Sequence, residues 1–227
     1  EAYMDNNPDA DITVRGGGSG TGIAALIDGA TDIADASRPM KDKEIKTARE
    51  KGVNPVAHII ARDGIAVIVH PDNLINAISL DDIKAIYTGQ ISRWDKIGGT
   101  GTIVVVSRDA ASGTFEAFNE LALANAKLTD QALMLASNLE VARTVAQTPG
   151  AIGYVGLGYL TDEVKALKVE GIKASDATVR DNTYPLARPL FMYTKGTPKG
   201  LAKSFIDFVM SPAGQKIVKE TGFVPAK

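Results

Sequence analysis

Short apolar segments typical of β-strands alternate along this chain with segments of helical periodicity, and this alternation restricts the fold more than any other feature. Strand composition occurs at 11–15, 32–36, 56–61, 65–69, 102–107, 151–155, 166–169 and 190–193. The stretches at 56–61 and 65–69 are either a strand pair or one long strand. Helical spacing occurs at 23–27, 41–51, 80–88, 115–118, 139–147 and 201–220. The run at 102–107 is almost wholly apolar, as in a parallel strand buried on both faces. The pattern predicts an α/β fold.

Length and charge narrow the classes of function. The chain has 227 residues, enough for one large domain or for two lobes of roughly 100 residues each. Its 25 basic and 27 acidic side chains leave a net charge of −2, which argues against a nucleic-acid or polybasic membrane surface. Cysteine is absent and only two histidines occur, His58 and His70. We therefore expect no disulfide, no metal centre and no cofactor.

The sequence Ser-Gly-Thr occurs twice, at 19–21 and at 112–114, each time between a predicted strand and a predicted helix. A helix N-terminus offers unpaired N–H groups and the positive end of the helix dipole, so such a loop can bind an oxyanion. Each serine could instead serve only as an N-cap. The second copy and Arg108, four residues before it, favour anion binding, because a guanidinium fork suits a tetrahedral oxyanion.

Three further polar residues stand at positions that could serve the same ligand. Ser37 follows the predicted strand at 32–36 and could donate a hydrogen bond, or it could simply form a turn. Asp63, between two apolar stretches, and Asp35, inside a strand, could accept a proton from the ligand. A buried carboxylate would repel a fully ionised anion of the same shape. Either aspartate could instead belong to a salt bridge or a turn.

The glycine-rich stretch at 16–22 also has to be compared with three other known motifs. A nucleotide P-loop requires lysine where Ile23 stands. A dinucleotide fingerprint, G-x-G-x-x-A, fits 20–25 with Asp35 downstream, so a dinucleotide-dependent enzyme stays an alternative. A serine-hydrolase elbow would need glycine in place of Thr21, and no acid–base–nucleophile set is present. A surface interaction module without a ligand is a third class.

Six motifs together carry a resemblance to a known family. They are GGGSGTGI at 16–23, DIADASRPM at 32–40, RDGIAVIVH at 62–70, IYTGQISRWDKIGG at 86–99, SRDAASGTFEAF at 107–118 and AIGYVGLGY at 151–159. In these residues the chain resembles the substrate-binding proteins of ABC phosphate importers, which belong to the type II periplasmic-binding-protein family. The motifs follow the family order and cover most of the chain.

The resemblance implies the type II periplasmic-binding-protein fold, with two α/β lobes around a central cleft joined by two crossings. Lobe I is expected at 1–68 plus 187–227, and lobe II at 69–186. Family members close on their ligand by hinge motion. They also begin with a strand and a turn that this sequence lacks, so we expect the first strand of lobe I, and any signal segment, to be missing from this chain.

The resemblance also implies a set of binding residues. Ser19, Thr21 and Ser37 would bind phosphate from one lobe, and Arg108, Ser112, Gly113 and Thr114 from the other. Arg38 stands about where some members have the aspartate that accepts the phosphate proton, so Asp63 is the expected substitute and Asp35 the second choice. Gly20 and Arg38 are further candidates at the site.

The implied function is that of a receptor without enzymatic activity. It would bind inorganic phosphate as a monomer and deliver it to the membrane permease of an ABC importer, with no nucleic-acid partner. The location would be extracytoplasmic, either periplasmic or lipid-anchored at the cell surface. A receptor for sulfate, molybdate or tungstate is the alternative within the same fold, and a dinucleotide-binding enzyme is the alternative outside it.

Overall fold

The computed structural model describes residues 1–16, 19–110 and 112–226, and the chain divides into two compact units. Unit 1 comprises Glu1–Arg62, Arg188–Glu220 and Pro225–Lys227, and unit 2 comprises Asp63–Ala187 and Thr221–Val224. The chain passes from one unit to the other within β2 (Pro55–Val69) and at the start of β9 (Ala187–Lys195), and the short segment Thr221–Val224 returns to unit 2 before the chain ends in unit 1. The predicted lobes differ from these units at 63–68, 187 and 221–224.

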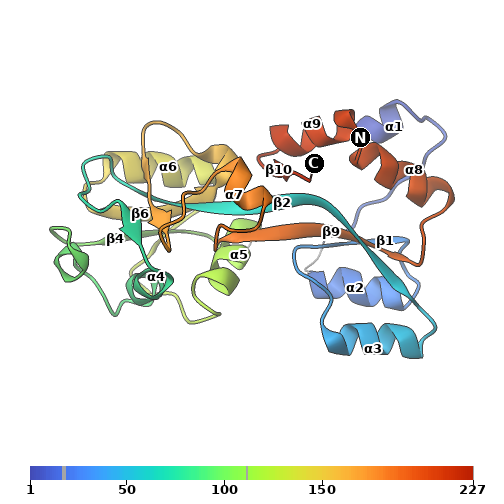
Figure 1. Ribbon diagram of the computed structural model, residues 1–227, viewed down its shortest axis with the longest axis horizontal. Coiled ribbons are helices and arrows are strands. Elements are labelled where there is room, and N and C mark those ends of the chain that lie inside the picture. The colour runs from blue at the N-terminus through green and yellow to red at the C-terminus, as the bar shows by residue number, and fades with distance from the viewer. Residues whose placement is uncertain (17–18, 111, 227) are drawn as a thin grey trace. The chain divides into compact units, whose positions relative to one another are not determined.

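Unit 1 is a small sheet with helices on both faces. Its elements are α1 (Ala2–Asp5), α2 (Ser19–Ile27), β1 (Ile33–Ala36), α3 (Asp42–Glu50), the first part of β2, β9, α8 (Gly200–Val209), α9 (Pro212–Glu220) and part of β10 (Val224–Pro225). β1 pairs antiparallel with β9, and β9 neighbours β2. Helices α2 and α3 cover one face, and α8 and α9 cover the other (Figure 1).

The core of unit 1 forms where α2 packs on β1 and β9. Ile23 and Leu26 of α2 are fully buried in one cluster with Ala34 of β1 and Phe191 of β9. An added Cβ on Gly22 would lie 3.3 Å from the Asp35 carbonyl oxygen, a tight contact, so glycine favours the close approach of α2 to the strand. The first turn of α2 is thereby held beside the end of β1.

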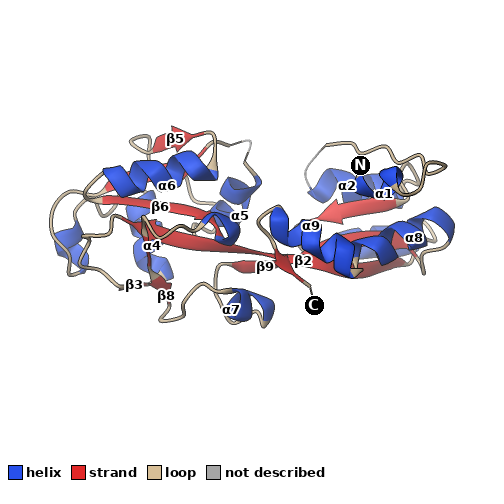
Figure 2. Ribbon diagram, turned by 90° about the horizontal axis from the view of Figure 1, so that it is seen from above, coloured by secondary structure: helices blue, strands red, loops and turns tan. Residues whose placement is uncertain are grey.

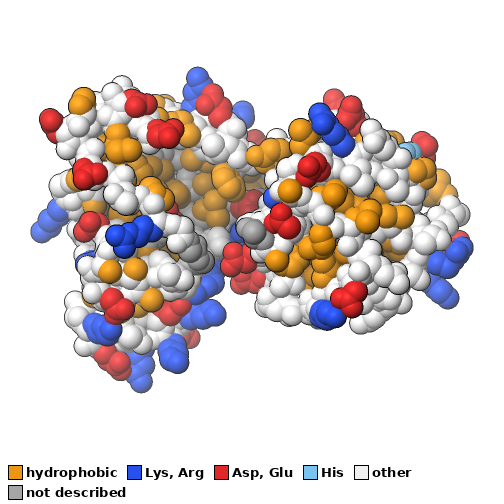
Figure 3. All heavy atoms as spheres, turned by 180° about the vertical axis from the view of Figure 1, so that it is seen from behind, with side chains coloured by type: hydrophobic (Ala, Val, Ile, Leu, Met, Phe, Trp, Pro, Cys, Tyr) orange, Lys and Arg blue, Asp and Glu red, His pale blue; other side chains and the backbone are white. Residues whose placement is uncertain are grey.

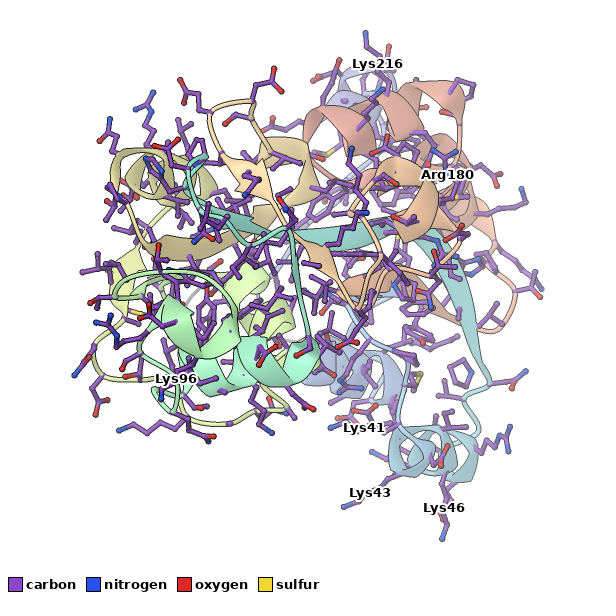
Figure 4. All side chains as sticks on the ribbon, turned by 60° about the vertical axis from the view of Figure 1, so that its left-hand side comes forward. Lys41, Lys43, Lys46, Lys96, Arg180 and Lys216 are labelled. Carbon is purple, nitrogen blue, oxygen red and sulfur yellow. The ribbon has the colours of Figure 1, made fainter. Side chains whose placement is uncertain are left out.

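Helix α3 is amphipathic and covers the outside of unit 1. Ala48 is buried, whereas Lys43 and Lys46 point away from the molecule (Figure 4). On the other face of the sheet, the Tyr3 ring of α1 packs edge-on against Phe205 and Phe208 of α8, with centroids 5.4 Å apart in both pairs. Apolar periodicity therefore explains which side of each helix is buried.

Unit 2 contains a mixed sheet with helices around it (Figure 2). Its elements are the second part of β2, β3 (Ala77–Ile78), α4 (Leu80–Tyr87), the 3₁₀ helix η1 (Trp94–Ile97), β4 (Val104–Arg108), α5 (Gly113–Leu121), β5 (Leu133–Leu135), α6 (Asn138–Gln147), β6 (Ala151–Gly156), the 3₁₀ helix η2 (Leu157–Tyr159), β7 (Lys165–Ala166), β8 (Lys168–Val169) and α7 (Asp176–Arg180). β6 lies between β2, its antiparallel neighbour, and β4, its parallel neighbour, while β3 and β8 form a separate parallel pair.

The apolar run at 102–107 has the environment predicted for it. β4 has a parallel neighbour on each side, β6 and β5, and Val106 at its centre is fully buried. Every residue of β6 is buried as well. Beneath these strands the rings of Tyr87, Phe118 and Tyr154 form one aromatic cluster. The α/β prediction is confirmed.

The predicted strand at 11–15 is wrong. These residues have no regular secondary structure, and Val14 is 81% exposed. Strand composition alone does not make a strand, because the backbone needs a paired neighbour and the side chains need a face to cover. The dinucleotide-binding alternative loses the strand that must precede its glycine loop. Gly17 and Gly18 of that loop lie outside the described residues.

Of the two arrangements predicted for the stretches at 56–61 and 65–69, the structure has the one long strand, β2. Two short elements were missed. Helix α7 was missed because its five residues are too few to show helical periodicity, although Ser175 caps it by accepting from the Thr178 N–H group. Strand β5 was missed because Leu133 and Met134 are both about half exposed, so no alternation marks it.

Candidate anion-binding half-sites

In unit 1, the structure brings together two serines that are 18 residues apart. Ser19 is the first residue of α2, and Ser37 follows directly on β1. The Ser37 N–H group donates to Ser19 Oγ at 3.1 Å, and the two hydroxyl oxygens lie 3.2 Å apart. Gly20 and Thr21 are exposed on the first turn of the same helix. The residues predicted to bind the anion from this unit therefore lie together at the N-terminus of α2.

Arg38 lies beside Ser19, Gly20, Thr21 and Ser37, which we call the unit 1 half-site. The positive charge of Arg38 is already paired with a carboxylate. Its Nη1 and Nη2 donate to Glu44 Oε2 at 2.9 Å and Oε1 at 2.8 Å. This hydrogen bonding lowers the pKa of the Glu44 carboxyl, and the Lys41 N–H group adds a further bond at 2.8 Å. An added Cβ on Gly20 would lie 3.5 Å from Arg38 Nη2, so the guanidinium lies beside the first turn of α2.

The two candidate aspartates have different surroundings. Asp35 lies between Ala34 and Ala36, which are buried against α2, so its side chain leaves β1 on the opposite face from that helix. More than a third of the residue is exposed, yet the protein packed around its carboxyl raises the pKa by desolvation. Asp63, the first residue of unit 2, is buried with 7% of its surface exposed. The proton-acceptor role stays a prediction for both.

In unit 2, Arg108 is the last residue of β4, and its guanidinium is held by backbone carbonyls. Nε donates to Leu135 O at 3.3 Å and Nη2 donates to Ala136 O at 2.8 Å. Both carbonyls belong to the end of the parallel neighbour β5 and the residue that follows it. The fork is therefore oriented by main-chain atoms at the carboxyl edge of the sheet.

The second Ser-Gly-Thr sequence forms the N-terminus of α5. Ser112 is the N-cap, is 7% exposed and accepts from the Phe115 N–H group at 3.3 Å. Gly113 and Thr114 are the first two helical residues, and an added Cβ on Gly113 would meet no atom within 4 Å. Arg108 ends β4 four residues before this N-cap, so its guanidinium and the helix N–H groups flank one short loop, and we call Arg108, Ser112, Gly113 and Thr114 the unit 2 half-site. Ala111, within the loop, lies outside the described residues.

Comparison with known proteins places the chain in a family. Residues 1–213 match the family model described as PBP superfamily domain. The phosphate-binding protein PstS of Bacillus subtilis is 40% identical over 228 residues, which cover 99% of this chain and 74% of that protein. The chain belongs to this family of phosphate-binding proteins. The resemblance inferred from the six motifs is thereby confirmed.

Solved structures of family members have the same fold. An ABC-type phosphate transport receptor from Vibrio cholerae is 29% identical with a TM-score of 0.86, over 98% of this chain and 91% of that one. A phosphate ABC transporter substrate-binding protein with bound phosphate from Clostridium perfringens is 35% identical with a TM-score of 0.70, over 100% and 92%. The predicted type II periplasmic-binding-protein fold is confirmed.

The sequence gives no sign that Tyr154 has a role near the candidate site, yet in the structure its side chain contacts the end of β4. Its Oη accepts from the Arg108 N–H group at 3.1 Å and is 2.8 Å from Ser107 Oγ. Its ring stacks on Phe118 with centroids 3.8 Å apart and an interplanar angle of 8°. Burial raises the pKa of the phenol. The apolar pattern at 151–155 predicts the strand that carries Tyr154 but gives no sign of this partner.

Clusters of acidic and histidine side chains, and the charge of the visible surface, bear on which ligands the described residues could hold. Over the ranges 1–16, 19–110 and 112–226, no group of three or more acidic or histidine residues could hold a metal ion. On the face seen in Figure 3, acidic and basic side chains are interspersed rather than separated by sign. In the same described ranges, no helix has the length and apolarity that crossing a membrane requires.

Proposed function

We propose that this chain is the phosphate receptor of an ABC importer and that its two half-sites bind inorganic phosphate. The observation that carries the proposal is that two kinds of oxyanion donor flank one short loop of unit 2, the Arg108 guanidinium before it and the capped N-terminus of α5 after it, in a chain of the phosphate-binding family. A guanidinium and a helix N-terminus are both suited to a tetrahedral oxyanion. The relative from Clostridium perfringens, with bound phosphate, supports the same ligand.

The hydrogen bonds within each half-site indicate which serine hydroxyls can still donate to the ligand. Ser112 Oγ accepts from the Phe115 N–H group, so its own O–H is available to donate. The hydroxyls of Ser19 and Ser37 share one hydrogen between them, which leaves one O–H to donate outward. Arg108, Gly113 and Thr114 in unit 2, and Gly20 and Thr21 in unit 1, are the other residues of the proposed site.

Selectivity would come from a carboxylate. Phosphate near neutral pH carries a proton and sulfate does not, so an ionised aspartate at the site accepts a hydrogen bond from phosphate and repels sulfate. Asp63 is our first candidate because it is buried, and Asp35 is the second. The variant Asp63→Asn is expected to narrow the preference for phosphate over sulfate, and an unchanged preference would transfer the role to Asp35.

The finer parts of the proposal rest on membership of the family. The receptor would act outside the cytoplasm, as a monomer and without catalysis or a cofactor, and would pass phosphate to the membrane permease of the importer. Donors of the kinds present in the half-sites, which are hydroxyls, N–H groups and guanidinium groups, can hold an anion without a metal ion.

Titration calorimetry with inorganic phosphate tests the proposal. The wild type should bind one phosphate, and Arg108→Ala should weaken binding at least about tenfold through the loss of charge-assisted hydrogen bonds. Arg93→Ala is the matched control, because Arg93 pairs with Asp95 at 2.7 Å on the surface of the same unit. Absence of phosphate binding by the wild type would refute the proposal. Sulfate competing at equal concentration would favour a general oxyanion receptor.

A further inference from the structure

We propose that Tyr154 is a positioning residue for phosphate binding, which holds Arg108 and the start of α5 in register without touching the ligand. This inference rests on the proposed function and extends it to a residue in the core of unit 2. The side chain of Tyr154 has two separate attachments, one through its hydroxyl to the end of β4 and one through its ring to α5.

The hydroxyl completes a closed set of hydrogen bonds around Arg108. The Arg108 N–H group donates to Tyr154 Oη at 3.1 Å, and Ser107 Oγ donates to Arg108 O at 3.2 Å. Tyr154 Oη and Ser107 Oγ lie 2.8 Å apart, a hydrogen bond in which either hydroxyl can donate. Both backbone polar groups of Arg108 are thus tied, directly or through Ser107, to one phenol.

The ring fixes the other side of the loop. Phe118, on which Tyr154 stacks at 3.8 Å, lies in α5, the helix that begins with Gly113 and Thr114. Tyr154 and Phe118 are both almost completely buried. The same side chain therefore contacts the Arg108 backbone before the loop and a ring of α5 five residues after Gly113, so it couples the end of β4 to the helix that follows.

The guanidinium of Arg108 has its own support, from the carbonyls of Leu135 and Ala136. Tyr154 consequently acts on the backbone from which the fork extends. A small shift of that backbone would misplace a bidentate donor, since such contacts require alignment of two hydrogen bonds at once. Removing only the phenol oxygen should therefore weaken phosphate binding and leave the ring packing in place.

The chain supplies a matched control in Tyr87. Its ring belongs to the same aromatic cluster, it is fully buried, and its Oη donates to Val106 O at 3.2 Å, on the same strand and two residues before Arg108. The variant Tyr87→Phe also removes one buried phenol oxygen next to β4, but it leaves the Arg108 backbone bonded. General destabilisation of the core would affect both variants alike.

The experiment measures phosphate affinity by calorimetry for the wild type, Tyr154→Phe and Tyr87→Phe, well below the thermal midpoint of each. Loss of one positioning hydrogen bond predicts about three- to tenfold weaker binding for Tyr154→Phe. Tyr87→Phe should stay within about twofold of the wild type even where its midpoint falls equally. Equal affinities for the two variants would overturn the positioning role.

Two further outcomes keep this inference separate from the proposed function. If the wild type does not bind phosphate, the proposed function fails and the positioning role fails with it. If the wild type binds and Tyr154→Phe does not fold, Ser107→Ala opens the same set of hydrogen bonds from the other side. That variant should weaken phosphate binding in the same direction, and affinity equal to that of Tyr87→Phe would overturn the inference.

Discussion

Replacing Arg108 by lysine separates the charge of this residue from the shape of its donor group. The guanidinium makes two hydrogen bonds to backbone carbonyls, at 3.3 Å and 2.8 Å, and lysine Nζ can reach only one of the two positions. One hydrogen bond of a charged group is lost from a partly exposed site, so unfolding should become easier by about 1 kcal/mol. The charge is retained, so long-range attraction of anions should change little.

The effect on the ligand should be larger than the effect on stability. A bidentate contact with phosphate becomes a single contact, a loss of about 1.5–3 kcal/mol, or roughly ten- to hundredfold in affinity. Calorimetry measures the affinity and thermal denaturation the stability, with Arg93→Lys as the control on the surface of the same unit. An Arg108→Lys protein that binds phosphate within about twofold of the wild type would refute the argument from donor geometry.

Three predictions concern stability. Asp35→Asn should stabilise the protein at neutral pH, because burial raises the pKa of Asp35 and the ionised carboxylate therefore destabilises the folded state. Below pH 3.8, the ordinary pKa of aspartate, the carboxyl is protonated in the folded and unfolded states alike. The advantage of asparagine, measured by thermal denaturation, should therefore disappear on acidification. Glu44→Gln should lower the free energy of unfolding by about 1 kcal/mol at pH 7, because it removes the ion pair with Arg38. Arg38 holds the pKa of Glu44 below 4.5, so the difference in stability between variant and wild type should vanish as acid protonates this carboxyl. A difference that stays constant with pH would contradict the ion pair. Gly153→Ala should cost about 1–3 kcal/mol, because its Cβ would lie within 2.8 Å of a buried valine of α6, whereas Gly16→Ala, with no atom within 4 Å, should leave the denaturation midpoint almost unchanged.

Features that depend on a few consecutive residues could be read from the sequence. Ser112 caps α5 through its own side chain, and Gly113 and Thr114 follow within the same helix. Arg108 ends the strand whose continuous apolar run marked it as buried. Capping and burial periodicity are local or nearly local effects, so the second Ser-Gly-Thr sequence was placed correctly at the end of a strand and the start of a helix.

Features that depend on pairing between distant segments could not be read in this way. The segment at 11–15 has strand composition and remains irregular, because composition does not supply a neighbouring strand. The sequence predicts Ser19 and Ser37 as separate possible donors, but their 3.2 Å contact follows from the packing of α2 on β1. The glycine that permits this packing, Gly22, was first interpreted only as part of a motif.

By itself the sequence determined the kind of protein: its α/β alternation, its family motifs and the types of donor that an oxyanion requires were all present in order along the chain. The tertiary structure decided how those donors are held. The carbonyls of Leu135 and Ala136 and the phenol of Tyr154 come from 27 to 46 residues away from Arg108. Hydrogen bonds of this range depend on how the strands pair and the helices pack, and no local pattern of residues encodes them.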